Sequence, residues 1–139
     1  MFLKRSLFSI LTLAVMGLVG CSGQDPVSPL AGFQPEISNA QDAFQLQATA
    51  LDGVSGVVSY PWQNSGSQAT INHSSAVDSG AVTVTIYDDS GAQVYGNPLV
   101  ASLNEQTTTG QPGRWIIVVE MTDVYGSLNF RADAFTPAQ

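Results

Sequence analysis

Basic side chains are almost absent from this chain. One lysine and three arginines stand against eleven acidic residues, and Lys4 and Arg5 lie at the extreme N-terminus. Without residues 1–20, two arginines face eleven acidic residues, a net charge of −9 if His73 and the chain ends are neglected. Because nucleic-acid binding depends on basic contacts to phosphates, this composition argues against a nucleic-acid partner. It also argues against a domain that lies flat on anionic lipid.

Histidine and cysteine are as scarce, with only His73 and Cys21. A transition-metal site needs several such ligands. No Gly-x-Ser-x-Gly motif surrounds a serine, so nothing suggests a serine hydrolase. His73 follows the alternation of Ala69 and Ile71, and we expect it at the edge of the core, hydrogen-bonded to backbone, or simply exposed.

Glutamates are equally few. A glycosidase needs two carboxyl groups that flank the scissile bond. Glu36 lies in a proline-rich segment, and Glu120 beside Asp123 is better explained as a solvated pair than as an acid and a nucleophile. Glu105 has no evident partner. We therefore predict that the protein is not an enzyme.

The N-terminal segment has the layout of an export signal. Lys4 and Arg5 precede a largely apolar run over residues 7–19. A basic start followed by a short apolar run is typical of a cleaved signal peptide. The run is shorter than the about 20 residues that span a bilayer, so we expect residues 1–20 to be removed.

Residues 18–21 read Leu-Val-Gly-Cys and resemble a bacterial lipobox. The resemblance implies cleavage between Gly20 and Cys21, a diacylglyceryl group on the thiol, and acylation that can follow at the new amino terminus. Two or more chains anchor a protein firmly, since each buried methylene contributes about 0.8 kcal/mol. An ordinary secretory signal with a chance cysteine is the alternative. We expect a lipid bilayer partner reached through Cys21, and no cofactor beyond these acyl chains.

Residues 21–38 are predicted to form a tether. They hold Pro26, Pro29 and Pro35 without sustained periodicity. Such a segment can also fold back along the domain, with Phe33 or Ile37 docking. The residue after the cysteine is a serine, which in some bacteria is compatible with outer-membrane sorting. The resulting expectation is a protein of the bacterial envelope, in the outer membrane, with its domain in the periplasm or at the cell surface.

From Asp42 onward apolar residues recur with a period of two. Alternating runs lie near residues 44–50, 54–62, 69–73, 82–86, 94, 99–103, 115–121 and 128–132, with Gly, Asp, Asn and Ser between them. About eight short strands without a helix predict an all-β fold, an antiparallel β-sandwich of jelly-roll or immunoglobulin-like type over residues 39–136. A small barrel is the alternative. We expect its core to centre on Trp115, Phe44, Phe130, Val84 and Ile86.

Two segments resemble each other within the chain. Residues 54–60 and 124–130 each place a glycine two residues before an aliphatic residue and four before an aromatic one. Two equivalent hairpins with a bulge or close approach at Gly56 and Gly126 would explain the match. Chance similarity between two strands is the other explanation.

Residues 82–91, 113–119 and 126–130 resemble the second half of small secreted bacterial β-sandwich modules, of which the pre-peptidase C-terminal domains are similar in style. The chain is also similar to small bacterial lipoproteins of its size. The resemblance covers residues 42–135 through strand and turn patterns. It implies an accessory or binding module with no catalytic residues to transfer.

Residues 88–91 (Asp-Asp-Ser-Gly) have two interpretations. Asp88 and Asp89 could form half of a calcium loop, because carboxylates on a tight turn are ligands that Ca²⁺ prefers. The same residues also form an ordinary hairpin turn, in which Asp bonds its own backbone and Gly takes positive φ. No spaced third carboxylate follows. This favours the turn.

One aromatic segment is a candidate ligand site. Tyr60 and Trp62 share one face of a strand near Asn64. If exposed, they would form a platform for stacking sugars or peptides; if buried, they form one end of the core, which the alternation favours. The polar loop over residues 107–113 lies where such folds often bind. We predict an envelope lipoprotein with a non-catalytic binding or scaffolding domain, whose partner is an envelope protein or glycan. A carbohydrate- or peptide-binding module that uses these aromatics is the alternative.

Overall fold

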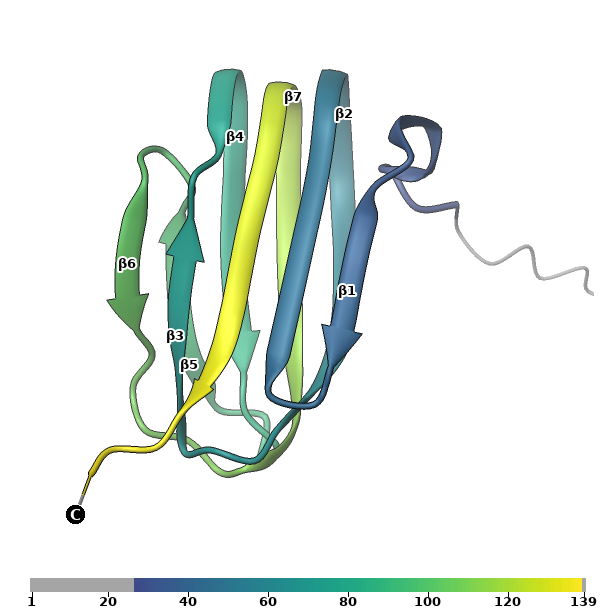
Figure 1. Ribbon diagram of the computed structural model, residues 1–139. Coiled ribbons are helices and arrows are strands. Elements are labelled where there is room, and N and C mark those ends of the chain that lie inside the picture. The colour runs from purple at the N-terminus through teal and green to yellow at the C-terminus, as the bar shows by residue number, and fades with distance from the viewer. Residues whose placement is uncertain (1–26, 139) are drawn as a thin grey trace, which may run out of the picture.

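The computed structural model describes residues 27–138, so the predicted signal peptide, Gly20 and Cys21 lie outside the described residues. Figure 1 shows a body built from strands, with one short 3-10 turn, η1 (Ala31–Phe33). The strands are β1 (Glu36–Ala40), β2 (Ala43–Asn64), β3 (Gln68–His73), β4 (Ala76–Tyr87), β5 (Gln93–Pro98), β6 (Leu103–Gln106) and β7 (Gly113–Phe135). Within this part of the chain no helix is long and apolar enough to cross a membrane.

All seven strands belong to one antiparallel sheet, which confirms the predicted all-β class. β7 is its central strand. Along its length it pairs with β2 on one side, and with β4 and then β3 on the other. β1 extends the sheet beside the first part of β2, β6 extends it beside β3, and β5 extends it beside β4.

The predicted count of about eight strands is corrected to seven. Residues 44–50 and 54–62 were expected to be two separate strands, but they form one strand, β2. Residues 115–121 and 128–132 likewise belong to the single strand β7. The run expected at residues 99–103 is replaced by β6, which starts only at Leu103.

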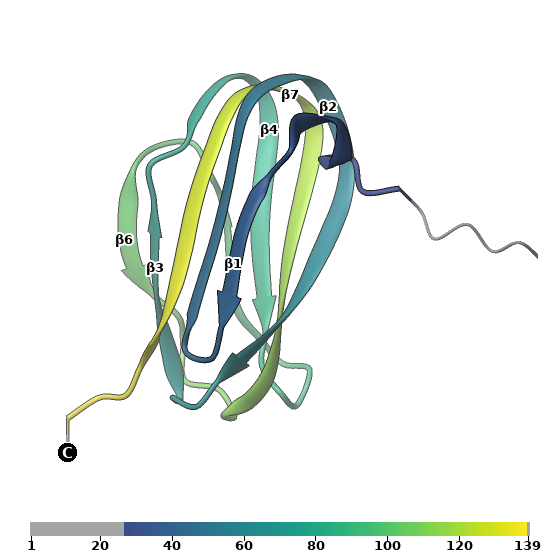
Figure 2. The same cartoon turned by 45° about the vertical axis from the view of Figure 1, so that its right-hand side comes forward.

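The long strands bend instead of ending because β2 and β7 are irregular at the same level. Their register shifts between Ala48 and Gly56. Ala50, Gly53 and Gly56 in β2 have positive φ, as do Asp123 and Gly126 in β7. Bulges of this kind bend a strand while its pairing continues. Figure 2 shows β2, β4 and β7 curving over at one end of the molecule.

β2 folds back on itself through this bend. The rings of Phe44 and Tyr60 lie 5.3 Å apart, centroid to centroid. In a straight strand these residues would be about 50 Å apart, at roughly 3.3 Å per residue. We call the sheet on one side of the bend the first half and the sheet on the other side the second half. The first half consists of β1, residues 43–48 of β2, residues 128–135 of β7, β3 and β6. The second half consists of residues 54–64 of β2, residues 113–124 of β7, residues 81–87 of β4, and β5.

The apolar side chains of both halves form the core. The five residues predicted for its centre are all buried. Trp62 and Trp115 are paired across β2 and β7 and meet edge to face, with centroids 6.0 Å apart and planes at 87°. Each indole N–H donates to a backbone carbonyl, that of Trp62 to Ala40 and that of Trp115 to Gln111.

Part of the predicted tether belongs to the folded body. Leu30 is fully buried in the core, and strand β1 begins at Glu36. Pro29 packs against Gly56 in the bend of β2, where a Cβ atom would stand 3.0 Å from the proline ring. The predicted docking of this segment therefore involves Leu30, with Phe33 packed against the core from the surface.

The two similar segments lie at matching bends of neighbouring strands. Gly56 in β2 has φ of 140° and Gly126 in β7 has φ of 121°. A Cβ atom on Gly126 would clash with the carbonyl oxygen of Ala76. The prediction of a close approach at the glycine is thus confirmed, but the segments are bends in paired strands and not hairpins.

Candidate functional site

Tyr60, Trp62 and Asn64, the candidate aromatic platform, do not form an exposed surface in the described structure. Trp62 is only 1% exposed, and Asn64 is equally buried. The Asn64 side chain accepts from the Gly66 N–H and donates to the Gln68 carbonyl, so it holds a turn. Tyr60 is half-buried against Phe44. Alternation along β2 turns these side chains inward, which is the buried interpretation.

Asp88 serves as the anchor of a turn. Its Oδ1 accepts from the N–H groups of Ser90 and Ala92 and from the Ser90 hydroxyl, and its Oδ2 accepts from the Gln111 N–H. The bond from the Gln111 backbone, together with those from Ser90 and Ala92, lowers the pKa of Asp88 below its ordinary value. The carboxylate thereby joins the β4–β5 turn to the loop before β7.

Asp89 has a similar structural contact, since its Oδ1 accepts from the Arg114 N–H at 2.9 Å. Over residues 27–138, no group of three or more His, Cys, Asp or Glu side chains lies close enough together to hold a metal ion. Both carboxylate oxygens of Asp88 and Oδ1 of Asp89 thus accept backbone N–H groups in the described turn.

The loop over residues 107–113 is pinned by hydrogen bonds. The Thr107 hydroxyl accepts from the Ala69 N–H, and the Thr107 carbonyl accepts from the Gln68 side chain. The Thr108 N–H donates to the Val94 carbonyl. These contacts join β3 to β5, so the loop closes one end of the body.

His73 is buried at the end of β3. It is 1% exposed, between Phe130 of β7 and Leu103 of β6 in the sheet. Neither ring nitrogen has a hydrogen-bond partner, so the backbone bond expected for it is absent in the described structure. Burial lowers the pKa of His73, and the negative charge of Glu105 opposes this shift only in part.

A second set of side chains was missed by sequence reasoning: the outer surface of the first half of the sheet. We call it the amide face, because asparagine and glutamine side chains dominate it. Its members are all polar and all at least partly exposed: Glu36, Ser38, Gln45, Gln47, Thr70, Asn72, Ser74, Asn104, Gln106, Asn129, Arg131 and Asp133.

Strand register brings these residues together in rows. Ser38 of β1 lies opposite Gln45 of β2, which lies opposite Arg131 of β7. The same row continues from Arg131 through Asn72 of β3 to Asn104 of β6. Two neighbouring rows run through Asn129 and through Asp133. Residues from five strands therefore form one continuous polar surface.

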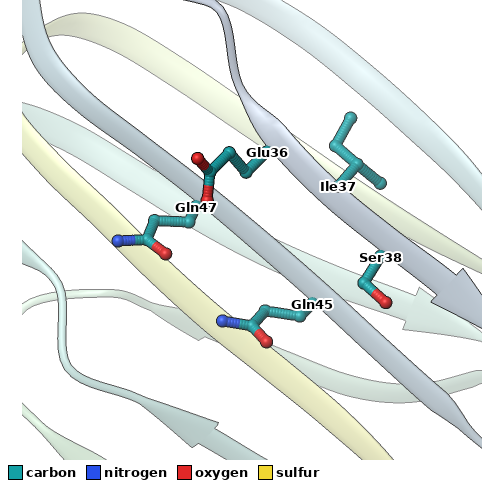
Figure 3. A pocket seen from close by; sticks show the side chains of 5 residues that line it. All are labelled: Glu36, Ile37, Ser38, Gln45 and Gln47. Atoms are coloured by element: carbon teal, nitrogen blue, oxygen red, sulfur yellow. The ribbon is translucent and has the colours of Figure 1, made fainter.

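The amide face is hollowed over its central strands. A depression of about 300 Å³ is lined by side chains from β2, β7, β3 and the residue after β3. They include Gln45, Asn72, Asn129, Arg131 and Asp133. A smaller depression adjoins it between β1 and β2. Figure 3 shows Gln45 and Gln47 extending side by side from β2 toward β7, with Glu36 beside Gln47.

Few of these polar groups bond to one another. An Arg131 guanidinium N–H donates to the Gln45 amide oxygen at 3.2 Å, and the Asn129 amide donates to the Ser74 hydroxyl at 3.1 Å. A guanidinium carries five donors and a primary amide carries two. Most of the hydrogen-bonding capacity of the amide face therefore points to solvent.

The outer surface of the second half of the sheet has a different character. It presents Val57, Pro61, Ile116 and Val118, with Val57 56% exposed, among polar residues that include Ser59, Thr85 and Glu120. The two outer surfaces thus differ in chemistry although both come from the same two long strands. The signal that would have revealed the amide face is the polar parity of the strands, since Gln45, Gln47, Asn129 and Arg131 all alternate with core residues.

Comparison with known proteins provides no family assignment. No protein-family model matches the chain, and no curated protein is significantly similar to it in sequence.

Proposed function

We propose that the protein is a bacterial envelope lipoprotein, anchored in a membrane by acyl chains on Cys21. Its folded domain binds or scaffolds another envelope component and performs no catalysis. The basic start, the short apolar run and the lipobox-like residues before Cys21 support the anchor. Ser22 supports sorting to the outer membrane, with the domain in the periplasm or at the cell surface.

The fold proposed for this domain is a β-sandwich, similar in style to the pre-peptidase C-terminal modules. The contact between Phe44 and Tyr60 supports it, because it brings the two halves of β2 against each other. Side chains buried from both halves would then fill the space between two layers, which pack about 10 Å apart in known sandwiches.

The observation that carries the binding role is the amide face. Asn72, Asn129 and Arg131 line one depression and direct donors and acceptors outward from their strands, although Asn129 and Arg131 each make one hydrogen bond within the face. A rigid polar surface of this kind suits recognition, because the groups are already ordered before a ligand arrives. The burial of His73 supports a non-catalytic role, because histidine is the most common general base and this ring is closed off from a substrate.

Mass spectrometry and detergent partitioning test the anchor. We expect the native protein to lack residues 1–20, to carry diacylglyceryl and acyl mass on Cys21, and to enter the detergent phase. Cys21→Ala should remain unprocessed and gain no lipid mass. A processed wild-type protein that carries an unmodified Cys21 and stays in the aqueous phase would overturn the proposal.

A further inference from the structure

The amide face allows the class of ligand to be inferred, on the basis of the binding role proposed above. Its central depression holds an arginine, a carboxylate and several amides within a few strands: Gln45, Thr70, Asn72, Asn129, Arg131 and Asp133. Neighbouring strands lie about 4.8 Å apart, and alternate residues along a strand lie about 6.6 Å apart. These distances make the surface a regular grid of donors and acceptors.

The charges around the depression argue against a charged ligand. Arg131 occupies the middle strand of the face, where it would repel a cationic side chain. The body as a whole carries a large negative charge, which would repel a polyanion. The opposite charges of Arg131 and Asp133, which lie two residues apart on β7, also cancel in the net charge of the depression. A ligand without net charge is repelled neither by Arg131 nor by the negative charge of the body.

The chemistry of the side chains argues against an apolar ligand. No large apolar side chain lines the central depression, whereas Val57 and Ile116 lie on the other outer surface. Amides, a carboxylate and a guanidinium pair with hydroxyl and acetamido groups, each of which both donates and accepts. A chain of linked sugars offers such groups at intervals along its length.

We propose that the depression on the amide face, centred on Arg131 and Asn72, binds an uncharged glycan. The ligand lies across β2, β7 and β3 and is held by hydrogen bonds to side chains from all three strands. Each such bond contributes only about 1 kcal/mol net, because water competes for the same groups. A single site is therefore weak, with a dissociation constant of about 1 mM. Several anchored copies on one polymer would strengthen attachment.

Nuclear magnetic resonance suits a site of this strength. The isotope-labelled, lipidated protein in detergent micelles is titrated with two neutral tetrasaccharides, one of glucose and one of N-acetylglucosamine, to about 10 mM. At least one sugar should shift the side-chain amide signals of Asn72, Asn129 and Gln45. A tetrasaccharide of galacturonate, which is anionic, should shift them at least tenfold less at the same concentration.

Two arginine variants provide a matched comparison. Arg131→Ala should lower the affinity for the neutral sugar roughly tenfold, as expected when a charged hydrogen-bond donor is lost. Arg114→Ala removes the exposed arginine of the second half and should leave the affinity unchanged. Unchanged backbone spectra of both variants establish that they fold.

Three results would overturn the inference. The first is the absence of side-chain shifts with both neutral sugars, and the second is equal weakening by the two arginine variants. The third is a set of shifts confined to the surface around Val57 and Ile116. Each of these leaves the proposed lipoprotein anchor standing, because its own test concerns Cys21 alone.

Discussion

Among single residues, His73 is the group whose environment suits its chemistry least. A neutral imidazole has one donor and one acceptor, and both are buried without a partner in the described structure. Leaving a polar group unsatisfied costs about 1–3 kcal/mol. The cost grows when the ring must hold a proton, because burial then removes a charge from water.

We predict that His73→Leu stabilises the protein by about 1–2 kcal/mol at pH 7.5, since leucine has a similar volume and no polar atom. Burial lowers the pKa of His73 in the folded state. The unfolded chain therefore binds the proton more readily, and wild-type stability falls as pH decreases through about 6.5. Denaturant unfolding at pH 7.5, 6.5 and 5.5 should show this slope in wild type and a flatter one in the variant.

The pH window matters because Asp42 and Asp88 also lose their stabilisation as pH falls, but they do so at lower pH than His73. Hydrogen bonds lower the pKa values of Asp42 and Asp88, so their stabilisation is complete above about pH 4 and is lost as pH falls through their folded-state values. Measurements above pH 5 thus isolate His73. If the stability of wild type and of His73→Leu changed equally with pH, His73 would not be the cause of this pH dependence.

At the scale of elements, the bends of β2 and β7 decide the architecture. Asp52-Gly53 has the composition of a hairpin turn, yet the chain continues as one strand because β7 bends beside it and stays paired with Leu51 and Val54 on either side. Local sequence specifies the ability to bend at this point. Whether the bend becomes a turn or a bulge depends on the neighbouring strand.

We predict that Gly126→Ala destabilises the protein by about 3 kcal/mol. Its φ of 121° is strained for any residue with a side chain, and the added methyl group would meet the Ala76 carbonyl. Gly32→Ala is the matched control, because nothing lies within 4 Å of the methyl group it adds. Thermal unfolding should separate the two variants clearly; similar midpoints would show that the bend tolerates a side chain.

At the scale of the whole molecule, the entry of the chain into the body links the proposed anchor to the domain. Leu30 is fully buried, and η1 and β1 follow it directly. The segment between Cys21 and the body is therefore short, since packing begins at residue 29 or 30. The proposed anchor holds the end of the body that contains the bends, because Pro29 packs there on Gly56.

We predict that Leu30→Ala destabilises the domain by about 2–4 kcal/mol, the cost of a cavity in a packed core. Val27→Ala removes an apolar side chain that is 81% exposed and should have little effect. Urea unfolding of both variants measures the difference. Equal stability would mean that the segment before β1 does not contribute to the core.

The sequence by itself determined the features that depend on local pattern. Alternation along the strands predicted the all-β class and the buried positions of Trp115, Phe44 and Phe130, because the side-chain period of a strand is the same wherever that strand lies. The turn over residues 88–91 was equally predictable, since Asp and Gly carry their turn preference in their own backbone and side chain.

Tertiary structure decided everything that depends on which strands meet. The joining of two predicted strands into β2, the burial of Leu30 and the assembly of Arg131, Asn72 and Gln45 on one surface all follow from pairing between segments far apart in the chain. Alternation assigns a side chain to one of two faces but does not identify its neighbours. Only the register across five strands brings separate polar residues together as the amide face.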